Sequence, residues 1–113
     1  KIMKNIILDN VNKFKPEIIL ISAGFDAHKR DPLAHINLES KDFFNLTQKI
    51  VELANIHCQG RVISFLEGGY DLVALSESIK EHILGLMENL REAIATDTLV
   101  EYSENFLDSY TAR

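Results

Sequence analysis

Apolar residues change their spacing along the chain, and the changes predict three helices and two strands. Spacings of three and four residues are typical of amphipathic helices, and they occur over residues 2–14, over 40–57 and beyond Asp71. Two short, nearly unbroken apolar runs, Glu17 to Ser22 and Arg61 to Leu66, are typical of strands that are buried on both faces. The predicted order is therefore helix, strand, helix, strand, helix.

Residues that start or stop helices stand at the ends of these segments. Pro16 ends the first helix, because the residue before a proline is pushed out of the helical region. Ser40 is the expected N-cap of the second helix, with Asp42 in its first turn and Gly60 beyond its end. Asp71 is placed to cap the third helix. The apolar stripe predicted for that helix consists of Leu72, Leu75, Ile79, Ile83, Leu86 and Leu90.

The alternation of helices and strands is the pattern of a βαβ crossover between parallel strands. The loops that leave two parallel strands lie at the same edge of the sheet, where open α/β folds bind ligands. We therefore expect the loop that contains Asp31 to lie beside the turn Gly68-Gly69-Tyr70. Residues 93–113 differ in character, and their pattern predicts a short helix or a frayed tail.

Composition narrows the class of protein. The 113 residues are 46% hydrophobic, which fits a globular fold, and the net charge of −5 argues against a direct nucleic-acid partner. Cys58 is the only cysteine, so the chain has no disulfide framework, and a reduced, cytoplasmic setting is expected. No apolar run approaches the roughly 20 residues of a membrane span, so no membrane partner is expected. The chain begins at Lys1 within a helical pattern, which suggests a piece of a longer protein.

Two stretches carry residue types that suit metal binding or catalysis. Asp26, His28, Asp31 and His35, in the loop after the first strand, combine carboxylate and imidazole groups, which are ligands of zinc and other divalent ions. The alternative is a solvated loop whose aspartates cap turns. Tyr70 follows two glycines at a strand exit, where a phenol can donate a hydrogen bond to a developing oxyanion. The alternative is an ordinary tyrosine in a turn.

The segments SAGFDAHKRDPLAHINL and LEGGYDL, in this order and separation, resemble the zinc-dependent histone deacetylase family. That family includes bacterial acetylpolyamine amidohydrolases and acetoin-utilisation proteins, and it shares its fold with arginase. The resemblance covers about residues 5 to 90 and implies the C-terminal part of a three-layer α/β fold with a parallel sheet. It implies a part-domain over residues 1–92, followed by a tail over 93–113.

The resemblance also implies roles for individual residues. Asp31 falls on a zinc-ligand aspartate, and Tyr70 falls on the catalytic tyrosine that polarises the acyl carbonyl. Gly68 and Gly69 match glycines beside the substrate channel. Asp26 and His28 become supporting residues to which the resemblance assigns no definite role, and a histidine at position 28 favours the acetylpolyamine-like branch. The family holds one Zn²⁺ ion with three protein ligands, and only one of the three is expected in this chain.

The implied reaction is hydrolysis of the acetyl amide of a small acetylated amine, such as an acetylpolyamine, or of acetyl-lysine in a protein. The family's catalytic histidines are expected upstream of this chain, so the fragment alone should be inactive. A homodimer of the full-length parent is compatible with the resemblance. Two alternatives stay open: a non-catalytic interaction or scaffold module derived from a deacetylase, and, with less support, an arginase-like hydrolase with two manganese ions.

Overall fold

The computed structural model describes the backbone of residues 3–95 and the side chains of residues 6–88. Its elements are, in order, the π-helical segment η1 (Met3–Leu8), α1 (Asp9–Phe14), β1 (Ile19–Ala23), α2 (Ser40–Cys58), β2 (Val62–Leu66) and α3 (Leu72–Ala95). The predicted order of helices and strands is confirmed. The helix or frayed tail predicted beyond residue 92 lies almost wholly outside the described residues.

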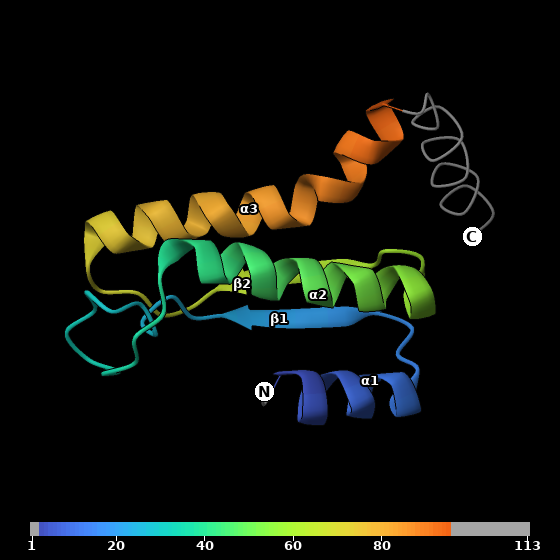
Figure 1. The fold of residues 1–113 in the computed structure, drawn as a ribbon, viewed down its shortest axis with the longest axis horizontal. Helices are drawn as coiled ribbons and strands as arrows, with labels where there is room; N and C mark the ends of the chain where they lie inside the picture. The colour runs from blue at the N-terminus through green and yellow to red at the C-terminus, as the bar shows by residue number, and fades with distance from the viewer. Residues whose placement is uncertain (1–2, 96–113) are drawn as a thin grey trace.

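The two strands pair in parallel, as the crossover pattern predicts. Their register joins Ile19 to Val62 at one end and Ala23 to Leu66 at the other. In Figure 1, α2 lies over the strands with α3 beside it, and α1 lies beyond β1 on the side away from α3. Both strands therefore end at the same edge of the sheet, and the loops that follow them start there.

The strands are buried on one face, which corrects the prediction that both faces are covered. Ala23 belongs to the core together with Phe25 and Phe43, and Ile21 packs against that core. Side chains on the other face are exposed among the described residues: Leu20 by 62%, Ile63 by 46% and Phe65 by 54%. Successive strand side chains alternate between faces, so the residues between the core positions point to the exposed face.

Helix α3 buries a different face from the predicted leucine stripe. Leu72 and Ile83 are exposed, whereas Leu75 and Ile79 pack against the core. Among the described side chains of α3, residues 72–88, the buried ones are small or polar: Ala74, Ser78, His82 and Gly85. Leu90 of the predicted stripe lies outside these described side chains. A Cβ at Gly85 would lie 2.9 Å from Thr47 Cβ, so the two helices approach too closely for large side chains on this line. The short distance between α2 and α3, rather than hydrophobicity, determines which residues of α3 are buried on this line.

The helix ends agree with the predictions except at the start of α2. Glu39, not Ser40, is the N-cap: its side chain and that of Asp42 form a capping box, with Glu39 N–H donating to Asp42 Oδ2 at 2.8 Å. Asp71 caps α3 as predicted, since its Oδ1 accepts the N–H of Ala74 at 2.7 Å. Within residues 3–95, no helix combines the length and the apolar character that crossing a membrane requires.

Candidate functional site

The loop after β1 and the turn after β2 are joined by backbone hydrogen bonds. Phe25 N–H donates to Gly68 O at 2.8 Å, and Glu67 N–H donates to Ala23 O at 3.0 Å. The parallel register brings the two strand ends together and makes these bonds feasible. The prediction that the Asp31 loop lies beside the glycine turn is confirmed.

Asp31 connects the two segments through its carboxylate. Oδ1 accepts the N–H of Leu33 at 2.9 Å, and Oδ2 accepts the N–H of Tyr70 at 2.8 Å. The residue is only 7% exposed. Burial by itself raises the pKa of Asp31, but four backbone N–H groups outweigh it and hold the pKa below its ordinary value. These groups belong to Leu33, Ala34, Tyr70 and Asp71. The carboxylate is therefore ionised, and it holds its loop against the turn that carries Tyr70.

The two glycines before Tyr70 allow the turn to approach its surroundings closely. A Cβ at Gly69 would lie 2.6 Å from Leu75 Cδ1, and the residue has a φ of +138°, which side chains rarely tolerate. A Cβ at Gly68 would lie 2.9 Å from Oδ1 of Asp26. The carboxylate of Asp26 thus packs against the glycine turn. The phenol side of Tyr70 points outward, because the residue is 58% exposed.

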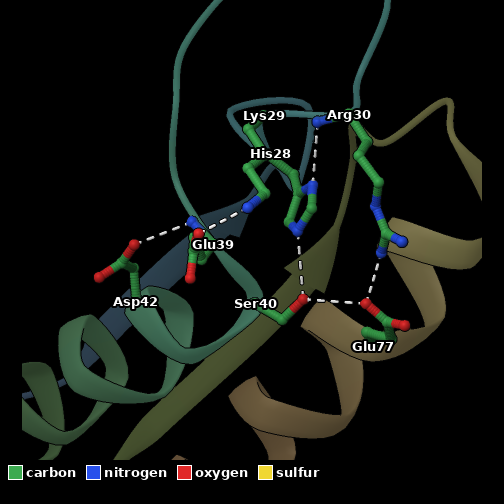
Figure 2. A network of polar contacts seen from close by, with 7 residues as sticks. All are labelled: His28, Lys29, Arg30, Glu39, Ser40, Asp42 and Glu77. Atoms are coloured by element: carbon green, nitrogen blue, oxygen red, sulfur yellow. Dashed lines mark hydrogen bonds and ion pairs between the residues drawn. The ribbon is translucent and has the colours of Figure 1, made fainter.

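His28 is buried, and both of its ring nitrogens are engaged within the protein. Nδ1 accepts the backbone N–H of Arg30 at 3.1 Å, and Nε2 lies 3.2 Å from Ser40 Oγ (Figure 2). An imidazole in this arrangement has no lone pair to offer a metal ion, so a self-contained site of Asp26, His28 and Asp31 does not form. Within the part of the chain that the structure describes, no group of three or more histidine, cysteine, aspartate or glutamate side chains is placed to hold a metal.

The contacts of His28 continue into α3. Ser40 Oγ donates to Glu77 Oε2 at 3.3 Å, and the guanidinium of Arg30 forms an ion pair with the same carboxylate. Sequence reasoning treated Ser40 as a cap and missed Arg30 and Glu77 altogether. No local signal could have found this pair, because 47 positions separate the two residues.

A second buried histidine, His82, joins α3 to α2 and β2. Thr47 Oγ1 donates to Phe43 O at 2.6 Å and therefore accepts from Nδ1 of His82, which lies 2.6 Å away. Nε2 of His82 lies 2.8 Å from Ser64 Oγ. Burial lowers the pKa of His82, so the ring is held neutral. Local sequence spacing gives no sign of these contacts, because Thr47 and Ser64 lie 35 and 18 positions away from His82.

Comparisons with known proteins agree on one family. The family model described as "Histone deacetylase domain" matches residues 1–86. Histone deacetylase 14, chloroplastic, of Arabidopsis thaliana is 42% identical over 86 residues, covering 76% of this chain and 20% of that protein. A histone deacetylase-like amidohydrolase of Pseudomonas aeruginosa is 38% identical over 68 residues, covering 60% of this chain and 18% of that protein. The solved structure of the HDA15 HD domain superimposes with a TM-score of 0.70 at 32% identity, covering 77% of this chain and 24% of that one. The chain thus spans about a fifth of the length of these relatives.

Proposed function

The chain belongs to the histone deacetylase domain family, and from this premise we propose that the full-length protein is a zinc-dependent deacetylase. Its substrates are the acetyl amides of acetylated lysine side chains or of acetylpolyamines. The observation that carries the proposal is the 2.8 Å hydrogen bond from Tyr70 N–H to Asp31 Oδ2. This bond places a buried carboxylate next to an exposed tyrosine at the edge where parallel sheets bind ligands.

Asp31 suits a single position in a metal site. Its carboxylate is ionised and lies at the point where the loop after β1 meets the turn that carries Tyr70, and an ionised carboxylate is a ligand that zinc accepts. The described residues contain no group of three ligands, so the remaining ligands would come from other parts of the full-length protein. When bound, a zinc ion would polarise the acyl carbonyl and lower the pKa of a coordinated water. The isolated chain should therefore bind zinc weakly and show no turnover.

Tyr70 is proposed to donate a hydrogen bond from its phenol to the acyl oxygen as negative charge develops there. Its exposed side chain can reach a bound substrate, while its backbone is held by Asp31. Gly68 and Gly69 are proposed to border the substrate channel, because they keep the turn free of side-chain atoms. Asp26 packs against this turn and supports it.

Further parts of the proposal concern the setting of the enzyme. Cys58 is a free, buried thiol, which fits the reducing cytoplasm. The name of the Arabidopsis relative, by contrast, assigns that relative to the chloroplast. A small acetylated amine or an acetyl-lysine protein is the expected partner, and a homodimer of the full-length protein is compatible with the fold. Residues 1–92 are proposed as the part-domain and 93–113 as a separate tail.

Activity of the full-length, zinc-loaded protein tests the proposal. It should hydrolyse acetyl-lysine peptides or acetylpolyamines, and the preferred panel member identifies the substrate class. Tyr70→Phe should lower kcat by about 100- to 1,000-fold with little change in KM, because the phenol acts on developing charge. Asp31→Ala should lose the metal together with activity. Tyr102→Phe, outside the matched residues, and Asp9→Ala, on the exposed side of α1, are the matched controls. Normal turnover of both site variants would refute these roles.

A non-catalytic interaction module is the second candidate. The observation in its favour is the apolar sheet face that carries Leu20, Ile63 and Phe65, each close to or above half exposed. The same assay decides between the two functions. A full-length protein that holds no zinc and cleaves no acetylated substrate would favour the interaction module.

A further inference from the structure

The hydrogen bonds around His28 select one tautomer of its ring. The single hydroxyl proton of Ser40 is donated to Oε2 of Glu77 at 3.3 Å. Ser40 Oγ must then accept from Nε2 of His28, which therefore carries the ring proton. Nδ1 is left with a lone pair, and the backbone N–H of Arg30 donates to it. The ring is thus held in one tautomer and one orientation, with both nitrogens hydrogen-bonded.

These contacts tie three elements together. His28 lies in the loop after β1, Ser40 is the first residue of α2, and Glu77 lies in the second turn of α3 (Figure 2). Arg30 contacts both ends of this network, because its backbone N–H donates to the His28 ring and its guanidinium forms an ion pair with Glu77. The ion pair itself is half exposed and contributes little energy. The buried imidazole, 3% exposed, is the rigid part of the network.

The same loop segment holds Asp31 through its backbone. Asp31 N–H donates to His28 O at 2.9 Å, three residues earlier in the chain. On the other side, Lys29 N–H donates to Leu38 O and Leu38 N–H donates to Ala27 O, so the His28 backbone is paired from both directions. A shift of the His28 ring would therefore be passed to the main chain that aims the Asp31 carboxylate.

We propose that His28 is a positioning residue, which holds the Asp31 carboxylate in place by bracing its loop against α2 and α3. The inference rests on the proposed function, in which Asp31 is a metal ligand. Groups that orient metal ligands without touching the metal commonly change metal affinity or activity by about 10- to 100-fold when they are removed. His28 acts through the backbone, and we expect an effect near the lower end of that range.

The experiment compares three substitutions of His28 in the full-length, metal-loaded protein. His28→Ala removes both contacts and should lower kcat by about 10-fold while KM stays unchanged. His28→Gln places an amide N–H near the position of Nε2 and should restore part of kcat through Ser40. His28→Asn replaces only the acceptor at Nδ1, cannot reach Ser40 and should restore less. The visible spectrum of the cobalt(II)-substituted protein should change in His28→Ala, since that spectrum reports the geometry of the metal.

Variants at Ser40 test the same interaction, the contact between His28 and Ser40 (hereafter the brace), from the side of α2. Ser40→Ala should resemble His28→Ala, and the double variant should lose no more than either single one, because both remove the same contact. Ser40→Ala also replaces His28→Ala if the latter does not fold. Ser76→Ala, which removes an exposed hydroxyl elsewhere on α3, is the control. Wild-type kcat and cobalt spectrum in folded His28→Ala and Ser40→Ala would overturn the proposal.

Failure of the brace can be distinguished from failure of the proposed function. A wild-type protein without turnover on any acetylated substrate refutes the deacetylase function. The positioning role of His28 is then tested by a structural measurement that needs no activity. That measurement is hydrogen exchange at the Tyr70 amide, which is donated to Asp31 Oδ2. Exchange should be faster in His28→Ala than in wild type, and equal exchange rates would overturn the brace in either case.

Discussion

Replacing Gly69 with alanine should be the most damaging single-methyl change at the candidate site. The residue has a φ of +138°, and the new Cβ would lie 2.6 Å from Leu75 Cδ1 and 3.3 Å from Phe25 Cβ. A side chain forced into a backbone region that favours glycine costs about 1–3 kcal/mol. Pressing a methyl group into a packed core costs about another 1–3 kcal/mol. We expect a loss of roughly 2–6 kcal/mol in the free energy of unfolding.

Gly68→Ala in the same turn is the matched control. The atoms nearest to its Cβ would belong to the carboxylate of Asp26, with Oδ1 at 2.9 Å, and that side chain can rotate away. The φ of Gly68 lies outside the positive range, so we expect a cost of about 1 kcal/mol or less. Urea unfolding of the full-length variants measures both changes. If Gly69→Ala and Gly68→Ala differed by less than about 0.5 kcal/mol, the reasoning from Leu75 and φ would be refuted.

Two further predictions concern buried polar groups of α3. Burial lowers the pKa of His82 below 6.5, so below that pH the unfolded chain binds more protons than the folded one. The contribution of neutral His82 to the free energy of unfolding should be fully present above pH 6.5 and should fall as the pH drops toward the folded-state pKa. His82→Gln should flatten this pH dependence in unfolding measured across pH. An unchanged slope would contradict the assignment. Ser78 Oγ is buried without a hydrogen-bond partner among the described residues, so Ser78→Ala should leave stability unchanged or raise it by up to about 1 kcal/mol in urea unfolding. A clear loss of stability would show that the hydroxyl has a partner.

The local features of the fold could be predicted from the sequence because they depend on neighbours along the chain. Helix spacing, the proline at position 16 and the cap at Asp71 each act within a few residues, and they placed both strands and the starts of α2 and α3 to within about two positions. They did not predict the π-helical segment η1. The cap of α2 was assigned one residue too late, because serine is a preferred N-cap residue and the reciprocal bonds between Glu39 and Asp42 override that preference.

The proximity of Asp31 and Tyr70 also followed from the sequence, because parallel strands bring their carboxyl ends to one edge. The hydrogen-bond partners of the buried histidines could not be predicted from the sequence. Ser40 and Glu77 are joined to His28 across three elements, and nothing in local spacing indicates which polar residues will meet. The face buried by α3 was mispredicted for a related reason, since apolar spacing does not report how closely two helices approach.

The sequence by itself determined the order of elements, the parallel pairing and the meeting of the Asp31 loop with the glycine turn. These features follow from periodicity and chain connectivity, which are properties of neighbouring residues. Only the tertiary structure decided which polar groups meet: it engages both nitrogens of His28 and places the carboxylate of Asp31 against backbone N–H groups of its own loop and of the glycine turn. Hydrogen-bond satisfaction in a packed core depends on residues far apart in the chain, so composition and spacing alone could not assign it.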